Sequence, residues 1–276
     1  MKKLILGALL LLPLAAQADD GHCEHQQARN LQLDLSGVNT VVFEIGGNDL
    51  DVRATAGAGN KVEGRACASD EKYLPQLTLT QERTGDKLVV IAKRENGSFG
   101  GIFLGNHYAY MKLQASVPDS ITVQLKVGSG DASVDGARAA RVDAGSGDVR
   151  ATRIREELRA AIGSGDLVAE DIGSLHLLSI GSGDATFRNV RGTSKVGSIG
   201  SGDLGIHGTQ GPVEIGSVGS GDVELRQVGG TVTIDSIGSG DVDADGVRGD
   251  LSVRSVGSGD IDHGGVTGRV DLPRKR

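Results

Sequence analysis

The stretch VGSGDVELRQVGGTVTIDSIGSGDVDADG, from Val218 to Gly246, contains the tetrapeptide Gly-Ser-Gly-Asp twice, 19 residues apart. The tetrapeptide occurs eight times in the second half of the chain, with successive spacings of 17, 18, 18, 19, 19, 19 and 19 residues. The copies begin at Gly128, Gly145, Gly163, Gly181, Gly200, Gly219, Gly238 and Gly257. A nearly constant period of this length is the signature of a repeat architecture in which each repeat is one structural unit.

The residues between two tetrapeptides predict short strands. Apolar residues occur in pairs two positions apart, such as Val223 with Leu225 and Val232 with Ile234, and polar residues lie between them. This alternation indicates strands that are buried on one face. Such short strands are stable only when equivalent strands of successive repeats pair with one another. We therefore expect an all-β, single-stranded β-solenoid, with about eight regular coils of 17–19 residues over residues 128–276. The usual handedness of parallel crossovers favours a right-handed coil.

One segment of the repeat region has a composition typical of a helix. The sequence ATRIREELRAA, residues 151–161, is rich in residues with high helix propensity. However, its Ile154 and Leu158 occupy the same repeat positions as the apolar residues of the other coils. The repeat pattern therefore predicts strands here too.

The first half of the mature chain, residues 19–127, is less regular. Its segments LQLDLSG, TVVFEIGG, KLVVIAK and ITVQLKV have strand-like patterns, and GGNDLDV, residues 46–52, resembles a degenerate copy of the repeat. We expect irregular, wider β-coils that continue into the regular stack, and a separate β-domain is the alternative. The loop at residues 95–110 holds most of the aromatic residues. It is either a surface individual to this protein or a cover for an open flank of the stack.

The N-terminus has the features of a secretory signal peptide. Two lysines precede an apolar run, and Ala16-Gln17-Ala18 has the small residues of a cleavage site, so residues 1–18 are expected to be removed after Ala18. No later segment is apolar over the length needed to span a membrane. The sequence therefore predicts a periplasmic or secreted protein, and the lack of a recognisable surface anchor favours the periplasm.

The two cysteines, Cys23 and Cys67, are expected to form a disulfide, because the predicted export places them in an oxidising compartment. Two free thiols are the alternative. Residues 22–25, His-Cys-Glu-His, contain metal-ligating side chains, but an unordered tail holds ligands poorly, so we expect no metal site there.

Charge and motif content exclude several functional classes. The net charge is −7 and no basic stripe occurs, which argues against a nucleic-acid partner. The sequence also lacks a nucleophile elbow, a phosphate-binding loop and a zinc-ligand spacing. We therefore predict no catalytic residues and no cofactor.

The tetrapeptide itself suggests a structural role at a corner of each coil. The glycines are expected to supply backbone angles that other residues avoid, and each aspartate to accept hydrogen bonds from N–H groups of its own corner. Stacking would place these aspartates in one column: Asp131, Asp148, Asp166, Asp184, Asp203, Asp222, Asp241 and Asp260. Carboxylates ~4.8 Å apart repel one another by roughly 1 kcal/mol in water, so donors or cations must offset this. The alternative to corner capping is a row of Ca²⁺ sites on these aspartates.

The repeated GSGD followed by an alternating strand, introduced by VPDSITVQLKVGSGDASVDG at residues 117–136, resembles bacterial adhesin-type domains of unknown function, of the toast-rack and auto-transporter-adhesin-head type. The resemblance implies an exported β-solenoid and brings neither a ligand nor catalytic residues. We expect a non-enzymatic cell-envelope protein that binds an unidentified protein or glycan. The alternatives are a Ca²⁺-stabilised rod and a polysaccharide-acting enzyme, and the short coils and missing aromatic stripe disfavour the enzyme.

Overall fold

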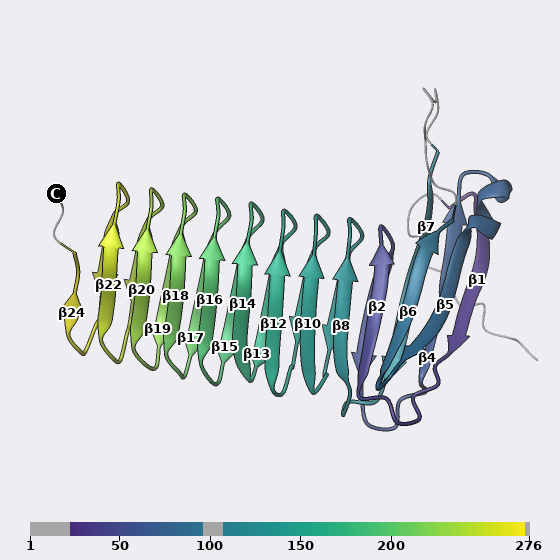
Figure 1. The fold of residues 1–276 in the computed structure, drawn as a ribbon, viewed down its shortest axis with the longest axis horizontal. Coiled ribbons are helices and arrows are strands. Elements are labelled where there is room, and N and C mark those ends of the chain that lie inside the picture. The colour runs from purple at the N-terminus through teal and green to yellow at the C-terminus, as the bar shows by residue number, and fades with distance from the viewer. Residues whose placement is uncertain (1–22, 96–106, 274–276) are drawn as a thin grey trace, which may run out of the picture.

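The computed structural model describes residues 23–95 and 107–273, which form two facing sheets of twelve strands each (Figure 1). Each regular coil contributes one strand to each sheet, and the coils stack in sequence along the long axis. The β-solenoid predicted from the repeat is confirmed.

The two sheets are named A and B here. In spatial order, sheet A contains β1 (His25–Gln32), β4 (Lys61–Ala68), β7 (Ala109–Val117), β3 (Asp49–Ala54), β9 (Ala132–Asp135), β11 (Val149–Thr152), β13 (Leu167–Ile172), β15 (Ala185–Val190), β17 (Leu204–Thr209), β19 (Val223–Val228), β21 (Val242–Asp245) and β23 (Ile261–Gly264). Sheet B contains β24 (Val270–Asp271), β22 (Leu251–Val256), β20 (Val232–Ile237), β18 (Val213–Val218), β16 (Ser194–Ile199), β14 (Ser174–Ile180), β12 (Glu157–Ile162), β10 (Ala139–Ala144), β8 (Thr122–Val127), β2 (Thr40–Gly46), β6 (Lys87–Arg94) and β5 (Leu77–Thr84). A short 3₁₀ helix, η1, spans Glu71–Gln76.

The repeat length fixes the register of the stack. Val223 lies opposite Leu204 of the preceding coil and Val242 of the next coil. Equivalent apolar residues therefore face inward in every regular coil, and the space between the sheets is the hydrophobic core. Residues 151–161, whose composition is typical of a helix, follow the same arrangement. They contribute to strands β11 and β12, and Leu158 and Ala160 are buried.

The first coil, formed by β2 and β3, stacks on a coil that is distant from it in the sequence. Strands β2 and β3 pair directly with β8 and β9, and the backbone N–H of Gly128 donates to the carbonyl of Gly46 at 2.8 Å. Residues 46–49 thus occupy the place of a Gly-Ser-Gly-Asp corner, as the degenerate repeat predicted. The intervening strands β4 to β7 stack on the other side of this coil rather than between it and the regular stack.

These inserted strands form a cap on the N-terminal end of the solenoid (Figure 1). Strands β6 and β7 pair in parallel with the first coil, whereas β5, β4 and β1 add antiparallel strands outside them. The two sheets are continuous through the cap. A simple succession of coils, as the sequence suggested, therefore does not describe this half of the chain, because residues 61–117 are inserted between two coils that touch.

Asn48 joins the cap to the stack. It stands where the regular repeat has its second glycine, and its side chain is buried. Its amide group donates to the carbonyls of Ile45 and Ala92 and accepts from the N–H of Met111 at 2.8 Å. A side chain fits at this position because the neighbour on that side is the cap rather than another glycine corner.

The disulfide between Cys23 and Cys67 is confirmed, with the two Cα atoms 5.4 Å apart. It ties Cys23, two residues before β1, to β4. The cap therefore begins with a covalent link across its outermost antiparallel pair.

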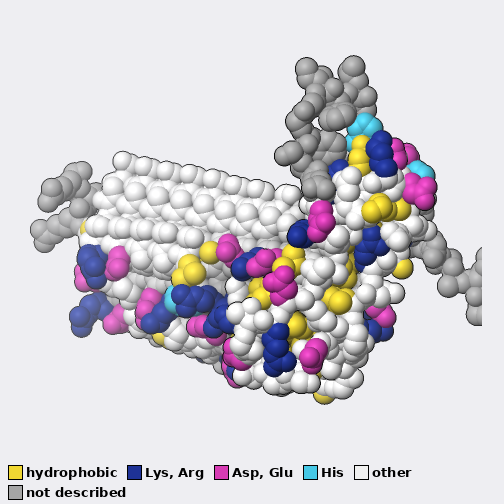
Figure 2. Space-filling view, turned by 45° about the vertical axis from the view of Figure 1, so that its right-hand side comes forward, with side chains coloured by type: hydrophobic (Ala, Val, Ile, Leu, Met, Phe, Trp, Pro, Cys, Tyr) yellow, Lys and Arg dark blue, Asp and Glu magenta, His cyan; other side chains and the backbone are white. Residues whose placement is uncertain are grey.

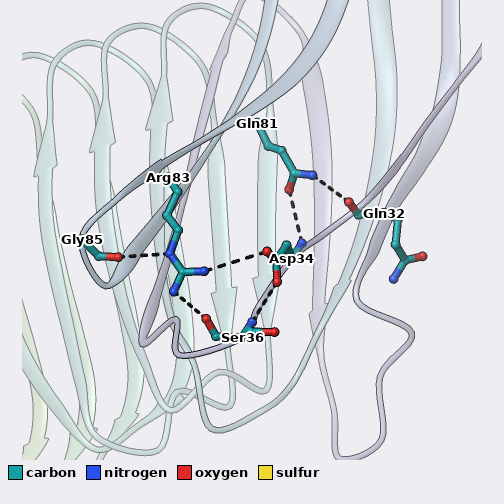
Figure 3. Close-up of polar contacts among 6 residues, drawn as sticks. All are labelled: Gln32, Asp34, Ser36, Gln81, Arg83 and Gly85. Carbon is teal, nitrogen blue, oxygen red and sulfur yellow. Dashed lines mark hydrogen bonds and ion pairs between the residues drawn. The ribbon is translucent and has the colours of Figure 1, made fainter.

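A second group of contacts holds the loop after β1 against the β5–β6 hairpin (Figure 3). Arg83 donates to the carbonyl of Ser36 at 2.5 Å and lies 3.9 Å from the carboxylate of Asp34. Gln81 donates to the carbonyl of Gln32 at 2.9 Å. Hydrogen bonds from Ser36, and to a lesser extent the charge of Arg83, lower the pKa of Asp34.

The residues at the opposite corner of each coil share an unusual backbone conformation. Eight residues, each eight positions after the first glycine of the tetrapeptide, adopt positive φ: Gly136, Arg153, Asp171, Asn189, Gly208, Gln227, Gly246 and Gly265. Only half of them are glycine, so the sequence did not reveal this column. Residues other than glycine are strained in the left-handed region.

The lowered pKa of Asp34 predicts how stability depends on pH. A depressed folded pKa stabilises the fold above the unfolded pKa of about 3.9, and this contribution is lost as pH falls through the lower folded pKa. We expect Asp34→Asn to reduce the free energy of unfolding at neutral pH, and the difference from the wild type to shrink below about pH 4 and to vanish only once the pH is below the folded pKa of Asp34. Urea unfolding across pH measures this. Asp86→Asn, on the same hairpin and without a side-chain hydrogen bond to a described residue, is the control; a pH-independent effect of Asp34→Asn would contradict the assignment.

The positive-φ column predicts a stabilising substitution. Gln227→Gly removes the strain of an L-residue in the left-handed region, which exceeds the extra chain entropy of glycine. We expect the free energy of unfolding to rise by about 0.5–1 kcal/mol. Gln210→Gly, at a corner position without positive φ, should instead lower it. Urea denaturation of both variants checks the sign, and destabilisation by Gln227→Gly would refute the argument.

Candidate binding surface

The Gly-Ser-Gly-Asp corners run along one narrow edge of the solenoid, where the sheet B strands end (upper edge of Figure 1). Each corner is hydrogen-bonded to the corner before it. The N–H of Gly219 donates to the carbonyl of Ile199, and those of Ser220 and Gly221 donate to the carbonyl of Gly200. The corner is therefore a continuation of the parallel stack rather than a loose loop.

The glycines of these corners serve a purpose other than the one inferred from sequence. None of them adopts positive φ, so the expectation of special backbone angles is wrong for these residues. Instead, successive corners approach very closely. A Cβ atom on the second glycine of a tetrapeptide would lie 1.7–2.1 Å from a carbonyl oxygen of the preceding coil, and one on the first glycine 2.4–2.9 Å from such an oxygen. Any side chain there would push the coils apart.

The aspartates form one hydrogen-bonded column, here called the aspartate ladder. Each carboxylate except that of Asp260, the last in the column, accepts a hydrogen bond from the backbone N–H of the aspartate in the next coil, at 2.7–3.2 Å. The ladder consists of Asp49, Asp131, Asp148, Asp166, Asp184, Asp203, Asp222, Asp241 and Asp260. The predicted capping of each aspartate's own corner is therefore replaced by a bond between coils. These bonds offset the repulsion between neighbouring carboxylates.

Each ladder bond uses only Oδ1 of the carboxylate. From Asp131 to Asp241, the second oxygen accepts no hydrogen bond from the described part of the chain. Within residues 23–95 and 107–273, no group of three or more His, Cys, Asp or Glu side chains is arranged to hold a metal ion.

The ladder borders two grooves on the outer face of sheet A. The larger has a volume of about 910 Å³ and crosses the junction between the cap and the first coils. Gly64 of β4 is part of its lining and lies very close to β7, because a Cβ atom there would be 2.1 Å from the carbonyl oxygen of Lys112. The smaller groove, about 530 Å³, is lined by Gly205 and by the ladder residues Asp203, Asp222 and Asp241.

The larger groove, here called the junction groove, carries both signs of charge. Its acidic residues are Asp49, Asp51, Glu63, Asp131 and Asp148, and its basic residues are Arg65, Lys112 and Arg150. Leu50, Leu113, Gln114, Ala132 and Ser133 complete the lining together with Gly64. The groove therefore offers a preformed surface for a partner with mixed charge and hydrogen-bonding groups.

The edge of the solenoid beside sheet B differs in its side chains from the junction groove. Figure 2 shows a broad band along the upper edge of the solenoid without charged or apolar side chains. The aligned serines of sheet B lie beside this edge: Ser179, Ser198, Ser217, Ser236 and Ser255. Charged side chains gather lower on the face (Figure 2). The charged junction groove and this neutral band are thus distinct surfaces.

The remaining residues singled out from the sequence form no site. His22 and residues 96–106 of the aromatic loop lie outside the described residues, and His25 begins β1. Tyr108 contacts Tyr110, with ring centroids 5.9 Å apart, and its hydroxyl accepts the N–H of Glu24. Tyr108 therefore helps to fasten the tail to the cap.

Comparison with known proteins identifies a family and finds solved structures with a similar fold. The family model described as Toastrack DUF4097 matches residues 38–245. A "putative adhesin" from Parabacteroides distasonis has a similar structure, with a TM-score of 0.56, 15% identity, and coverage of 87% of this chain and 97% of that one. A "putative lipid binding protein" from the same organism gives a TM-score of 0.51 at 19% identity, covering 90% and 98% of the two chains. Among curated proteins, none matches the sequence. No helix in the described residues is long and apolar enough to cross a membrane.

The close approach of the corners predicts a strong effect of one added methyl group. In Gly221→Ala the new Cβ would lie 1.9 Å from the carbonyl oxygen of Gly202, so the backbone must shift. We expect the free energy of unfolding to fall by at least about 2 kcal/mol. The neighbouring control, Ser220→Ala, should change it by less than about 0.5 kcal/mol. Equal, small effects in urea unfolding would show that the corners are not closely packed.

The hydrogen bonds of the ladder predict that folding does not require calcium. Because backbone N–H groups already bind each carboxylate, we expect the same thermal midpoint in Ca²⁺ and in EDTA. Circular dichroism of residues 19–276 measures this. A midpoint that rises with Ca²⁺ concentration would instead establish metal binding by the folded state.

Proposed function

The chain belongs to the Toastrack DUF4097 family, and on this premise we propose that it is an exported, non-enzymatic module of the cell envelope. It binds an envelope component, a protein or a glycan, through the outer face of sheet A. The junction groove is the centre of this binding face.

The preformed junction groove carries the proposal. Its lining residues come from five strands that are hydrogen-bonded side by side, β4, β7, β3, β9 and β11. Ladder bonds fix its acidic border, since Asp49 and Asp131 accept the N–H groups of the next coils. A face whose residues are already ordered loses little conformational entropy when a partner binds.

The face is also large enough for a macromolecular partner. Twelve strands at a spacing of ~4.8 Å extend about 50 Å along the solenoid. A polar surface with both signs of charge suits a specific, reversible interface more than an obligate one. The two similar structures, a "putative adhesin" and a "putative lipid binding protein", support a binding role and differ in the partner they suggest.

Export rests on two features. The disulfide between Cys23 and Cys67 is typical of an oxidising compartment. Residues 1–18, which lie outside the described residues, have the sequence features of a signal peptide. Cell fractionation and mass spectrometry should find a mature chain that begins at Asp19 outside the cytoplasm; an uncleaved cytoplasmic chain would refute export.

Site-specific photo-crosslinking in cells tests the binding face. A photo-reactive amino acid at Gln114, in the junction groove, should form a discrete cross-linked product with one envelope component. The same substitution at Gln124, on β8 of sheet B, is the matched control and should not. Adding Arg150→Glu to the Gln114 variant should reduce the yield severalfold, because it reverses a charge in the groove. Identical products from both positions, or none from either, would contradict the proposal.

A further inference from the structure

The two ends of the solenoid are built differently. At the N-terminal end the outermost strands of the two sheets, β1 and β5, are antiparallel to their neighbours. At the other end, β23 and β24 are the last strands of sheets A and B in the described part of the chain. No strand of the described residues pairs with their outer backbone edges, and an unpaired edge of this kind is a template for a further strand.

The last coil also contains core-type residues that are incompletely covered. Val270 of β24 is 37% exposed, whereas Leu251, its counterpart one coil earlier, is fully buried. Ile261, Val266 and Leu272 are only partly buried against the core. These residues would become buried if another layer of strands stacked on the end.

We propose that two copies of this chain join tail to tail through their last coils. A twofold axis along the sheet normal would place β24 against β24 of the partner and β23 against β23, both antiparallel. A second copy fits this end better than an extended peptide, because it offers two strands at the matching separation. A single peptide strand would cover only one of the two edges.

Charge complementarity supports the second copy as the occupant. In the antiparallel register that places Val270 opposite the partner subunit's Val270, Arg269 faces the partner subunit's Asp271. The twofold axis repeats this pair, so the interface contains it twice. Neither side chain forms an ion pair or a hydrogen bond with a described residue. Both are exposed.

The sheet A half of the end is more polar. His263 of β23 stands where the preceding coil has the buried Ala244, and Asp262 is exposed. Backbone pairing is therefore the contribution expected from β23. The apolar and charged contacts of β24 determine the register. This inference does not depend on the proposed binding function, because the junction groove lies at the other end of the stack.

Sedimentation velocity of the mature protein over a range of concentrations tests the proposal. The wild type should form a dimer. Arg269→Asp and Asp271→Arg should each weaken dimerisation by about tenfold or more, since each puts like charges opposite one another twice. Lys195→Asp, in the middle of sheet B, is the control and should leave the dimer unchanged.

Mixing the two charge-reversal variants tests the proposed pairing of Arg269 with the partner subunit's Asp271 most directly. Each variant alone repels itself, but a pair made of one Arg269→Asp chain and one Asp271→Arg chain restores both attractive contacts. An equimolar mixture should therefore form heterodimers with nearly wild-type affinity. Circular dichroism should show that both variants are folded. A wild type that stays monomeric, assembles into longer filaments, or dimerises regardless of either reversal would overturn the proposal.

Discussion

The close approach of the backbone between successive coils is the constraint on which the structure depends. At each Gly-Ser-Gly-Asp corner the second glycine has space for a hydrogen atom but not for a Cβ atom. This contact allows N–H groups of one corner to reach the carbonyls of the corner before it, so the hydrogen bonding of the sheets continues around the edge. The aspartate then completes the corner by binding the N–H of the next aspartate.

Two grooves border this regular edge. The ladder places one carboxylate per coil along the border of sheet A, and Gly205 leaves an outward position of the smaller groove without a side chain. The strands that line the grooves are hydrogen-bonded to neighbouring strands on both sides. Variation between coils is confined to outward side chains, so the same scaffold accommodates different surface chemistry on each face.

The sequence predicted what the repeat imposes and missed what depends on three-dimensional neighbours. Alternating residues such as Val223 and Leu225 identified the strands, and the period overruled the helix propensity of residues 151–161. The prediction that the glycines of the tetrapeptide supply special backbone angles is wrong. A recurring glycine is expected equally where two backbones approach closely, and the sequence alone does not distinguish these two causes.

The cap and the grooves could not be predicted from the sequence pattern, because both depend on contacts between segments that are distant in the sequence. Residues 61–117 are inserted between two touching coils, and nothing in a linear pattern shows that β2 pairs with β8. The junction groove is lined in part by residues of β4 and β7, which are cap strands outside the repeat. The positive-φ column was hidden because Arg153, Asp171, Asn189 and Gln227 share no side-chain chemistry.

Amide hydrogen exchange of the ladder tests the central claim most directly. The N–H of Asp222 donates to Asp203 at 2.8 Å, so it should exchange as slowly as the strand amides of β19. Asp203→Ala should remove that protection at Asp222 and leave the β19 amides protected. An Asp222 amide that already exchanges in the wild type as fast as an open loop would contradict the account.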